Sequence, residues 1–459
     1  MRRSFSWLTC VALLSSGCGS PSDDGDADGS ATETSPDASA TEASSDASAE
    51  TTQGESSATT DTTGGTTAET GTETGDGDGD CPAAVLGAEL GADGLMIGGT
   101  MEDASFQSTS FDLRYRYLAG SVPTQGPCTS CASGCTVDGE SCDNANGCAW
   151  WGCWQYDQVP PGQFVLDFVD VVEAGGGVPM FTYYIWFSVA GGVEGQAEID
   201  ALNDGARVDA YLADWRFLME RLAAATDGPV LVHVEPDLWG YGHQISDDPT
   251  QIPVALAAAG DPACSGSGNH FAGLARCMLD IAREVAPNVK VGFHASAWGA
   301  GADALINDDA SFDLAAHAEE TAAYMRALGA DEADLVVVEM SDRDAGFNGR
   351  WWDASDTTLP HFAQAIAWTQ TLGESLDLAP LWWQVPYGNP ALQDACDRYS
   401  DNRVDYVFDH PERFSAGGAL GVAFGAGTGC MTTAETDDGH FLSRAATYFE
   451  GEPPAFCPP

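Results

Sequence analysis

The sequence predicts an α/β fold, a closed (β/α)8 TIM-type barrel with a disulfide-rich insertion between its second and third strands. Two observations predict it. Short apolar segments alternate with amphipathic stretches of helical periodicity, and strands that alternate with helices form parallel sheets. The apolar segments number eight, which closes a barrel. A doubly wound open sheet is the alternative, but no Gly-x-Gly-x-x-Gly turn follows the first predicted strand.

The predicted strands are runs of β-branched and other apolar residues, as is typical of parallel strands covered on both faces. In chain order they are Gly94–Gly98, Leu113–Leu118, Val178–Trp186, Val230–Glu235, Val289–His294, Leu335–Glu339, Leu381–Val385 and Leu420–Phe424. Between them, apolar residues recur at helical spacing in Arg207–Ala224, Phe271–Val285, Leu314–Leu328 and Phe362–Leu376. We expect residues 81–459 to form this one domain.

The first eighteen residues have the pattern of an export signal. Arg2 and Arg3 precede an apolar run that ends at Leu14, and small residues then lead to Cys18. The run is too short to span a bilayer. The segment resembles a bacterial lipoprotein signal, which implies cleavage before Cys18, lipidation of Cys18 and anchoring to the bacterial cell envelope. The resemblance does not decide whether the anchored protein is exposed on the cell surface. A plain secretory signal is the alternative.

Residues 19–80 consist almost entirely of Ser, Thr, Gly, Ala, Asp and Glu, without an aromatic or basic residue. Such a composition cannot bury enough apolar surface to fold, so we expect a disordered acidic linker. The chain as a whole carries a formal charge of -53. A field of this sign repels nucleic acid and anionic membrane surfaces and favours neutral or cationic partners.

Cysteine usage also indicates an oxidising compartment. Beyond Cys18, twelve cysteines remain, and six of them lie from Cys128 to Cys153 in the insertion, about residues 120–160. We expect these six to form disulfides chiefly among themselves. Zinc binding is the alternative, but the second cysteine pair with zinc-finger spacing is missing. For the outer six, the predicted pairs are Cys264 with Cys277, Cys396 with Cys430, and Cys81 with Cys457.

Two predicted strands end in a glutamate. Strand alternation places Glu235 and Glu339 on the inward face of the barrel, at the carboxyl ends of the fourth and sixth strands, where barrel enzymes have their active sites. Two carboxylates that face one cleft are the minimal equipment for glycoside hydrolysis. Asp237, Asp342 and Asp344 follow closely and are alternatives for the second carboxylate. A structural role, with Arg343 or Arg350 as partners, is the competing interpretation.

Aromatic residues cluster at the same strand ends. Large rings with a polar edge suit a half-open cleft, and sugar rings stack on them while polar side chains bind the hydroxyl groups. The predicted substrate-binding residues are His233, Asp237, Trp186, Tyr184, Trp239, Tyr241, His294, Trp298, Asp342, Trp383 and Gln384.

These residues resemble the strand ends of (β/α)8-barrel glycoside hydrolases. The resemblance rests on His-Val-Glu-Pro-Asp at 233–237, Val-Val-Glu-Met-Ser-Asp at 337–342 and Trp-Trp-Gln-Val-Pro at 382–386. It implies a hydrolase of a polysaccharide that uses Glu235 and Glu339 as its catalytic pair. Together with the export signal and the acidic charge, we expect an exported, monomeric enzyme that acts on a neutral or cationic polysaccharide and needs no cofactor. Where the largest clan of retaining barrel enzymes has a glutamate on the seventh strand, this chain has Gln384.

Two other functions stay open. His233, Glu235, His294 and Glu339 could converge as metal ligands in a barrel metallohydrolase, although we expect no metal. A non-catalytic polysaccharide-binding lipoprotein would use the same aromatic cleft. It would be favoured if both glutamates formed buried ion pairs with arginines.

Overall fold

The computed structural model of the protein describes residues 81–120, 122, 135–137, 140–142, 154–155, 161–347 and 349–458. The predicted signal with Cys18 and the linker at residues 19–80 lie outside this part. The side chains of the six cysteines from Cys128 to Cys153, among which disulfides are predicted, lie outside it as well. Within the described residues, no helix has both the length and the apolar character needed to cross a bilayer.

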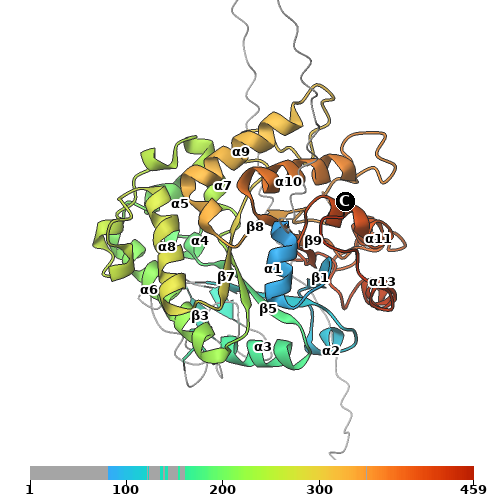
Figure 1. Ribbon diagram of the computed structural model, residues 1–459, viewed down its shortest axis with the longest axis horizontal. Coiled ribbons are helices and arrows are strands. Elements are labelled where there is room, and N and C mark those ends of the chain that lie inside the picture. The colour runs from blue at the N-terminus through green and yellow to red at the C-terminus, as the bar shows by residue number, and fades with distance from the viewer. Residues whose placement is uncertain are drawn as a thin grey trace, which may run out of the picture. The chain divides into compact units, whose positions relative to one another are not determined.

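Eight parallel strands close into a barrel in the order β1-β10-β9-β8-β7-β6-β5-β2, which confirms the predicted fold class (Figure 1). The strands are β1 (Met96–Gly99), β2 (Leu113–Ala119), β5 (Val178–Tyr184), β6 (Val230–Val234), β7 (Val289–His294), β8 (Leu335–Glu339), β9 (Ala379–Val385) and β10 (Gly421–Phe424). A short antiparallel pair, β3 (Cys135–Val137) and β4 (Glu140–Cys142), belongs to the insertion between β2 and β5.

Helices surround the barrel, and four of the predicted helices are found with almost unchanged bounds (Figure 1). The α-helices are α1 (Pro82–Leu90), α2 (Asp103–Phe106), α3 (Gln163–Ala174), α4 (Trp186–Ala190), α5 (Gln196–Ala201), α6 (Gly205–Ala225), α7 (Leu238–Ile245), α8 (Phe271–Val285), α9 (Leu314–Leu328), α10 (Phe362–Leu376), α11 (Arg403–Asp409), α12 (Pro411–Ala416) and α13 (His440–Phe449). Short 3-10 turns are η3 (Pro249–Gln251), η4 (Leu256–Ala258), η5 (Pro262–Cys264) and η6 (Ala330–Glu332).

Side-chain caps explain several helix starts. Asp204 before α6 and Asp313 before α9 accept hydrogen bonds from backbone N–H groups of the first turn. Such caps satisfy donors that have no partner within the helix. Two predicted strands end earlier than expected. Trp186 begins α4 instead of ending β5, and Glu235 leaves β6 with a positive φ of 47°.

The buried residues form two layers, as strand alternation predicts. Leu231 and Val337 belong to the cluster inside the barrel, whereas Val232 and Val336 belong to the layer between strands and helices. Helix α1 contributes Leu86 to the inner cluster, beside residues at the first positions of the strands. It therefore closes the amino end of the barrel, and the carboxyl ends of the strands are left to form the cleft.

All three disulfides predicted outside the insertion are confirmed. Cys81 is bonded to Cys457, Cys264 to Cys277, and Cys396 to Cys430. The first of these joins residues 376 positions apart in the sequence and ties the start of α1 to the carboxyl-terminal segment. That segment packs on α1 as well, because a Cβ at Gly87 would lie 2.3 Å from the Phe456 ring.

Removing the Cys81–Cys457 disulfide is expected to lower the free energy of unfolding by about 2–4 kcal/mol, because the unfolded chain regains the freedom of a very long loop. The measurement is urea unfolding of the Cys81→Ser, Cys457→Ser double variant under non-reducing conditions. The matched control is Cys396→Ser, Cys430→Ser, which opens a loop of only 34 residues and should cost less. Equal midpoints for the first variant and the wild type would contradict the expectation.

Candidate active site

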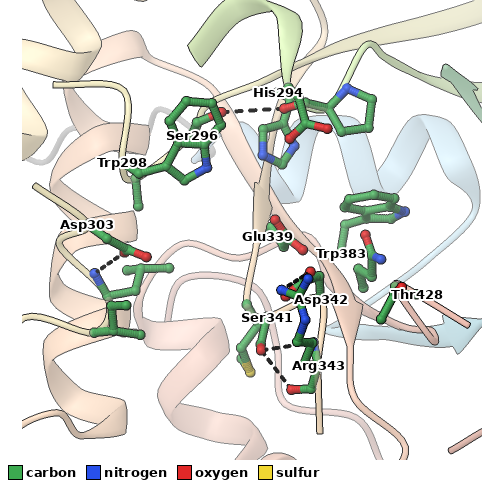
Figure 2. A pocket seen from close by; sticks show the side chains of 18 of the residues that line it. His294, Ser296, Trp298, Asp303, Glu339, Ser341, Asp342, Arg343, Trp383 and Thr428 are labelled. Atoms are coloured by element: carbon green, nitrogen blue, oxygen red, sulfur yellow. Dashed lines mark hydrogen bonds and ion pairs between the residues drawn. The ribbon is translucent and has the colours of Figure 1, made fainter. Parts of the chain in front are cut away.

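A cavity of about 700 Å³ lies at the carboxyl ends of the barrel strands. Nine of the predicted site residues line it: Tyr184, Asp237, Tyr241, His294, Trp298, Glu339, Asp342, Trp383 and Gln384. Figure 2 shows Glu339 between Trp383 on one side and Trp298 and Asp303 on the other. Glu235, His233, Trp186 and Trp239 are not among the lining residues. The structure therefore brings most of the predicted site together around Glu339.

Glu339 is the last residue of β8, and it reaches the cleft from inside the barrel. Burial raises the pKa of its carboxyl well above the ordinary value, and the nearby charges of Asp342, Asp237 and Asp303 raise it further. The positive charge of Arg343 lowers this pKa, but its effect is the smallest of these contributions. Desolvation and like charges both disfavour the ionised form. Both effects favour the protonated form of Glu339, which is the form that a general acid needs.

Asp237 lies two residues beyond Glu235, at the N-cap position of α7, and lines the same cleft. Burial and the charge of Glu194 raise its pKa to about 6, while a hydrogen bond with Tyr184 acts in the opposite direction. Its carboxyl is thus mostly ionised at neutral pH. The surroundings of Glu339 and Asp237 thus shift their pKa values to different extents, which is the condition that separates an acid from a base or nucleophile.

Glu235 does not point into the barrel, so that part of the prediction is wrong. Its Oε1 accepts hydrogen bonds from the backbone N–H groups of Ile185 (3.2 Å) and Trp186 (3.0 Å) and from the Tyr211 hydroxyl (2.9 Å). The positive φ at this residue breaks the strand alternation and turns the side chain toward α4 and α6. Burial raises the pKa of its carboxyl to about 8. Glu235 therefore holds the start of α4 in place.

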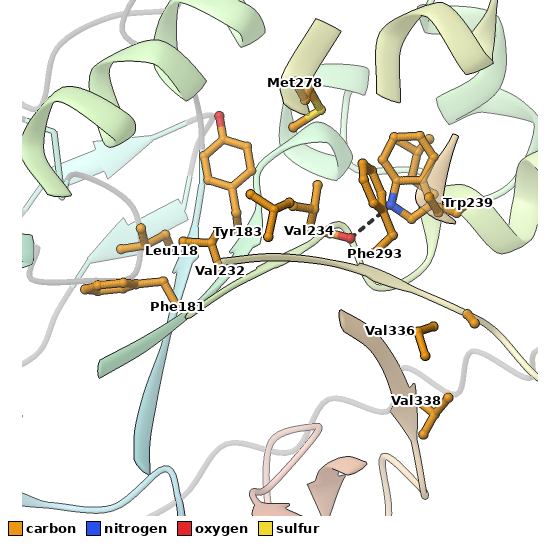
Figure 3. Close-up of a cluster of buried hydrophobic side chains, with 14 of the residues drawn as sticks. Leu118, Phe181, Tyr183, Val232, Val234, Trp239, Met278, Phe293, Val336 and Val338 are labelled. Carbon is orange, nitrogen blue, oxygen red and sulfur yellow. Dashed lines mark hydrogen bonds between the residues drawn. The ribbon is translucent and has the colours of Figure 1, made fainter. Parts of the chain in front are cut away.

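Two predicted tryptophans also pack outside the barrel instead of in the cleft. The Trp239 indole N–H donates to the Val234 carbonyl at 2.9 Å, and its ring contacts Phe293, as Figure 3 shows. The Trp186 indole N–H donates to the backbone carbonyl of Glu198 at 3.0 Å, and the Trp186 ring packs edge-on against Tyr211. Both indoles thus find an internal partner and belong to the core between barrel and helices.

His233 lies one layer below the cleft and supports its floor. Its Nε2 is 3.1 Å from Nδ1 of His294, and its Nδ1 is 3.3 Å from the Thr182 hydroxyl. The Trp383 ring packs edge-on against His233 with ring centroids 4.6 Å apart. Burial lowers the pKa of both histidines, to about 3 for His294, so both imidazoles are neutral. The chain of polar groups fixes His294, which does line the cleft.

Aromatic rings form the walls. Tyr184 stacks on Phe187 with centroids 5.7 Å apart, and Tyr241 packs against Trp298 at 4.9 Å. Gln384 accepts a hydrogen bond from Tyr117 at 3.0 Å. The sequence interpretation missed several lining residues: Tyr117, Phe187, Glu194, Ser296, Asp303 and Arg350. Strand alternation, which identified Glu339, could also have identified Tyr117, because Leu113, Tyr115 and Tyr117 share the inward face of β2.

The two competing arrangements are not observed. Neither glutamate pairs with an arginine in the described part of the chain, and Arg343 pairs with Asp342 instead. The proposed metal set of His233, Glu235, His294 and Glu339 is not brought together, because Glu235 turns away from the barrel interior. Asp344, the third alternative acid, is buried and accepts hydrogen bonds from Gly388 and Thr432 backbone N–H groups.

Fold and site define this protein as a (β/α)8 barrel with an acidic, aromatic cleft at the carboxyl ends of its strands. The sequence matches no protein-family model and no curated protein. Among solved structures, it is similar to an endo-β-1,4-mannanase of glycoside hydrolase family 26 from Cellulomonas fimi, with 11% identity, a TM-score of 0.46, and 82% of this chain and 75% of that chain covered.

Two further solved structures are similar at the same level. For a GH5-4 broad-specificity endoglucanase from an uncultured bacterium, identity is 13%, the TM-score is 0.40, and 79% of this chain and 96% of that chain are covered. For a β-1,4-mannanase from the sea hare Aplysia kurodai, identity is 10%, the TM-score is 0.39, and 78% of this chain and 87% of that chain are covered. Similarities this low do not transfer an activity or a substrate to this chain.

Proposed function

We propose that this protein is a glycoside hydrolase that cleaves a neutral or cationic polysaccharide, with Glu339 as general acid and Asp237 as the second carboxyl. One observation carries the proposal: two carboxyls line one aromatic cleft in different surroundings, which raise the pKa of Glu339 well above its ordinary value and that of Asp237 only to about 6. Glycoside hydrolysis needs such a pair, one protonated and one ionised.

In the proposed reaction, Glu339 gives its proton to the glycosidic oxygen while the bond from that oxygen to the anomeric carbon breaks. The carboxylate of Asp237 either bonds to the anomeric carbon and is later displaced by water, or removes a proton from a water molecule that attacks this carbon. A carboxyl separation of about 5–5.5 Å accompanies the first course and about 6.5–9.5 Å the second.

Other residues of the cleft suit the binding of a sugar chain. The exposed faces of rings such as Tyr241 and Trp298 offer stacking surfaces, and Gln384 and His294 offer hydrogen-bonding groups for hydroxyls. Glu194, Asp303 and Asp342 give the lining an acidic excess over Arg343 and Arg350. An anionic polysaccharide would be repelled by this field, so neutral glycans and amino-sugar polymers are the favoured substrates.

Glu235 has a positioning role in this proposal. By accepting the N–H groups of Ile185 and Trp186, it fixes the segment that begins with Tyr184. Tyr184 in turn lines the cleft and forms the hydrogen bond that lowers the pKa of Asp237. Glu235 thus acts through the backbone and Tyr184 and not on the substrate.

We also propose that the enzyme is a monomer exported and anchored to the cell envelope through a lipid on Cys18, with residues 19–80 as a tether. The support is the sequence pattern of residues 1–80. Mass spectrometry of the mature protein tests it: a diacylated or triacylated amino-terminal cysteine is expected, and an unmodified product excludes the anchor.

The function is tested by incubating the purified protein with a panel of neutral and amino-sugar polysaccharides, with an anionic one as control. The expected result is release of reducing ends from at least one neutral or cationic polymer and none from the anionic polymer. Saturable binding of a polymer without any release would instead identify a binding protein. Neither binding nor release across the panel would reject the proposal.

The pH dependence of kcat/KM is expected to be bell-shaped. Activity rises with pH through about 6, because Asp237 must lose its proton, and falls at higher pH, where Glu339 loses the proton that it donates. Changing Tyr184→Phe removes a hydrogen bond that favours the Asp237 carboxylate, so the acid limb should move to higher pH. An acid limb that stays at the same pH in this variant would contradict the assignment to Asp237.

A further inference from the structure

Outside the cleft, three side chains with metal-binding atoms converge between α7 and α9. His243 belongs to the last turn of α7, Asp247 follows that helix, and Glu320 belongs to α9. One ligand atom from each residue lies within 4.8 Å of the other two. His243 is buried, whereas Asp247 and Glu320 are exposed. The cluster is thus a fixed imidazole under two carboxylates that can move.

The imidazole of His243 has an unused nitrogen in this cluster. The side chain is only 4% exposed, and its Nε2 is buried without a hydrogen-bond partner. The nearest acid, Asp247, has its Oδ1 3.9 Å from Nε2, which is too far for a hydrogen bond. Buried polar atoms almost always have a partner, so this orphaned nitrogen indicates a missing ligand.

The ring is also held in one orientation. It stacks on the Tyr324 ring, with centroids 4.1 Å apart and planes 8° from parallel. Because the stack fixes the ring plane, the free nitrogen keeps one direction relative to α9. The histidine is therefore preorganised as a ligand.

From this geometry we propose that His243, Asp247 and Glu320 bind a divalent transition-metal ion of the Zn²⁺ type, with water completing the coordination. One nitrogen and two carboxylate oxygens form a set that Zn²⁺ accepts. Bonds of about 2.0–2.1 Å place the ligand atoms of a tetrahedral site about 3.3 Å apart. The present distances of at most 4.8 Å between these atoms need to shorten by no more than about 1.5 Å to reach that spacing.

The charges agree with a cation. In the part of the chain that the structure describes, neither Asp247 nor Glu320 forms an ion pair with Lys or Arg. Two carboxylates this close repel each other, and a bound cation removes the repulsion. The proposed ion would join α7 to α9. Because α7 starts directly after Asp237 and carries Tyr241, the ion would also stabilise one wall of the cleft without taking part in the reaction.

The test uses the full-length mature protein, freed of metal with a chelator and then dialysed. Titration calorimetry with ZnCl2 should give one saturable site, and the melting temperature should rise with Zn²⁺ concentration. Co²⁺ should substitute and give visible absorption bands typical of four-coordinate geometry. These readouts do not depend on any enzymatic activity.

Three variants locate the site. Glu320→Gln and Asp247→Asn alter exposed side chains and should each weaken Zn²⁺ binding at least tenfold. His243→Phe keeps the stack on Tyr324 and should abolish the site. The matched control is the double variant His410→Phe, Glu412→Gln. These two residues lie outside the cluster, with His410 Nδ1 and Glu412 Oε1 3.9 Å apart. The affinity of this control for Zn²⁺ should equal that of the wild type. Absence of saturable binding, or affinity unchanged in Glu320→Gln and Asp247→Asn, would overturn the proposal.

Discussion

Changing Glu339→Gln is expected to reduce kcat on the cleaved polysaccharide by on the order of 10²-fold or more, with KM nearly unchanged. Glutamine has the shape of the protonated acid but cannot give its proton to the glycosidic oxygen. Since burial and like charges raise the pKa of this carboxyl and so favour its neutral form, a neutral glutamine is a close substitute for it in the free enzyme. Initial rates at saturating substrate, together with binding of the same polymer, measure the effect.

Asp237→Asn should reduce kcat by a comparable factor, because the second carboxyl must be ionised to act as nucleophile or base. Glu235→Gln is the control that separates the two glutamates. Its carbonyl oxygen can still accept from Ile185, Trp186 and Tyr211, so turnover should stay close to that of the wild type. Loss of turnover in Glu235→Gln, with normal turnover in Asp237→Asn, would restore the pair that the sequence predicted. Normal turnover in Glu339→Gln would reject the acid role.

The fold was predictable because apolar runs and helical periodicity report burial directly. Strand alternation also separated Leu231 from Val232 and Leu335 from Val336 correctly, since each pair divides between the inner and outer layers. The three outer disulfides also agree with the predicted pairs, although an even number of cysteines indicates only that they are oxidised and does not select one pairing among the fifteen that six cysteines allow.

The site was less predictable because it lies where the regular pattern ends. Alternation holds through Val234 and fails one residue later, where the backbone of Glu235 takes a positive φ. A period-two pattern does not predict such a change of backbone conformation. Asp237, the next acidic residue, lines the cleft where Glu235 was expected. Trp186 and Trp239 fail for a related reason. Both lie in the first turn of a short helix, α4 or α7, and their rings face outward from the barrel. Sequence alone does not distinguish a ring in a cleft from one in the core.

The loop that carries one side of the cleft depends on a buried ion pair. Asp401 accepts hydrogen bonds from the Arg403 guanidinium at 2.6 Å and from the Ala345 backbone N–H at 2.6 Å. Arg403 donates in turn to the Arg350 carbonyl at 2.9 Å and stacks over the Trp352 ring at 4.8 Å. Both charged side chains are at most 1% exposed. The pair therefore fastens both ends of the segment from Ala345 to Arg350, which borders the cleft.

Changing Asp401→Ala is expected to lower the free energy of unfolding by about 3–5 kcal/mol, because it leaves the Arg403 charge buried without its partner. Urea unfolding measures the loss. The double variant Asp401→Leu, Arg403→Met should recover part of it, since an apolar pair leaves no charge behind. Arg398→Ala, which removes an exposed ion pair with Asp438, is the control and should leave the free energy of unfolding nearly unchanged. If Asp401→Ala is as stable as this control, the pair does not hold the loop, and the order of this side of the cleft has another source.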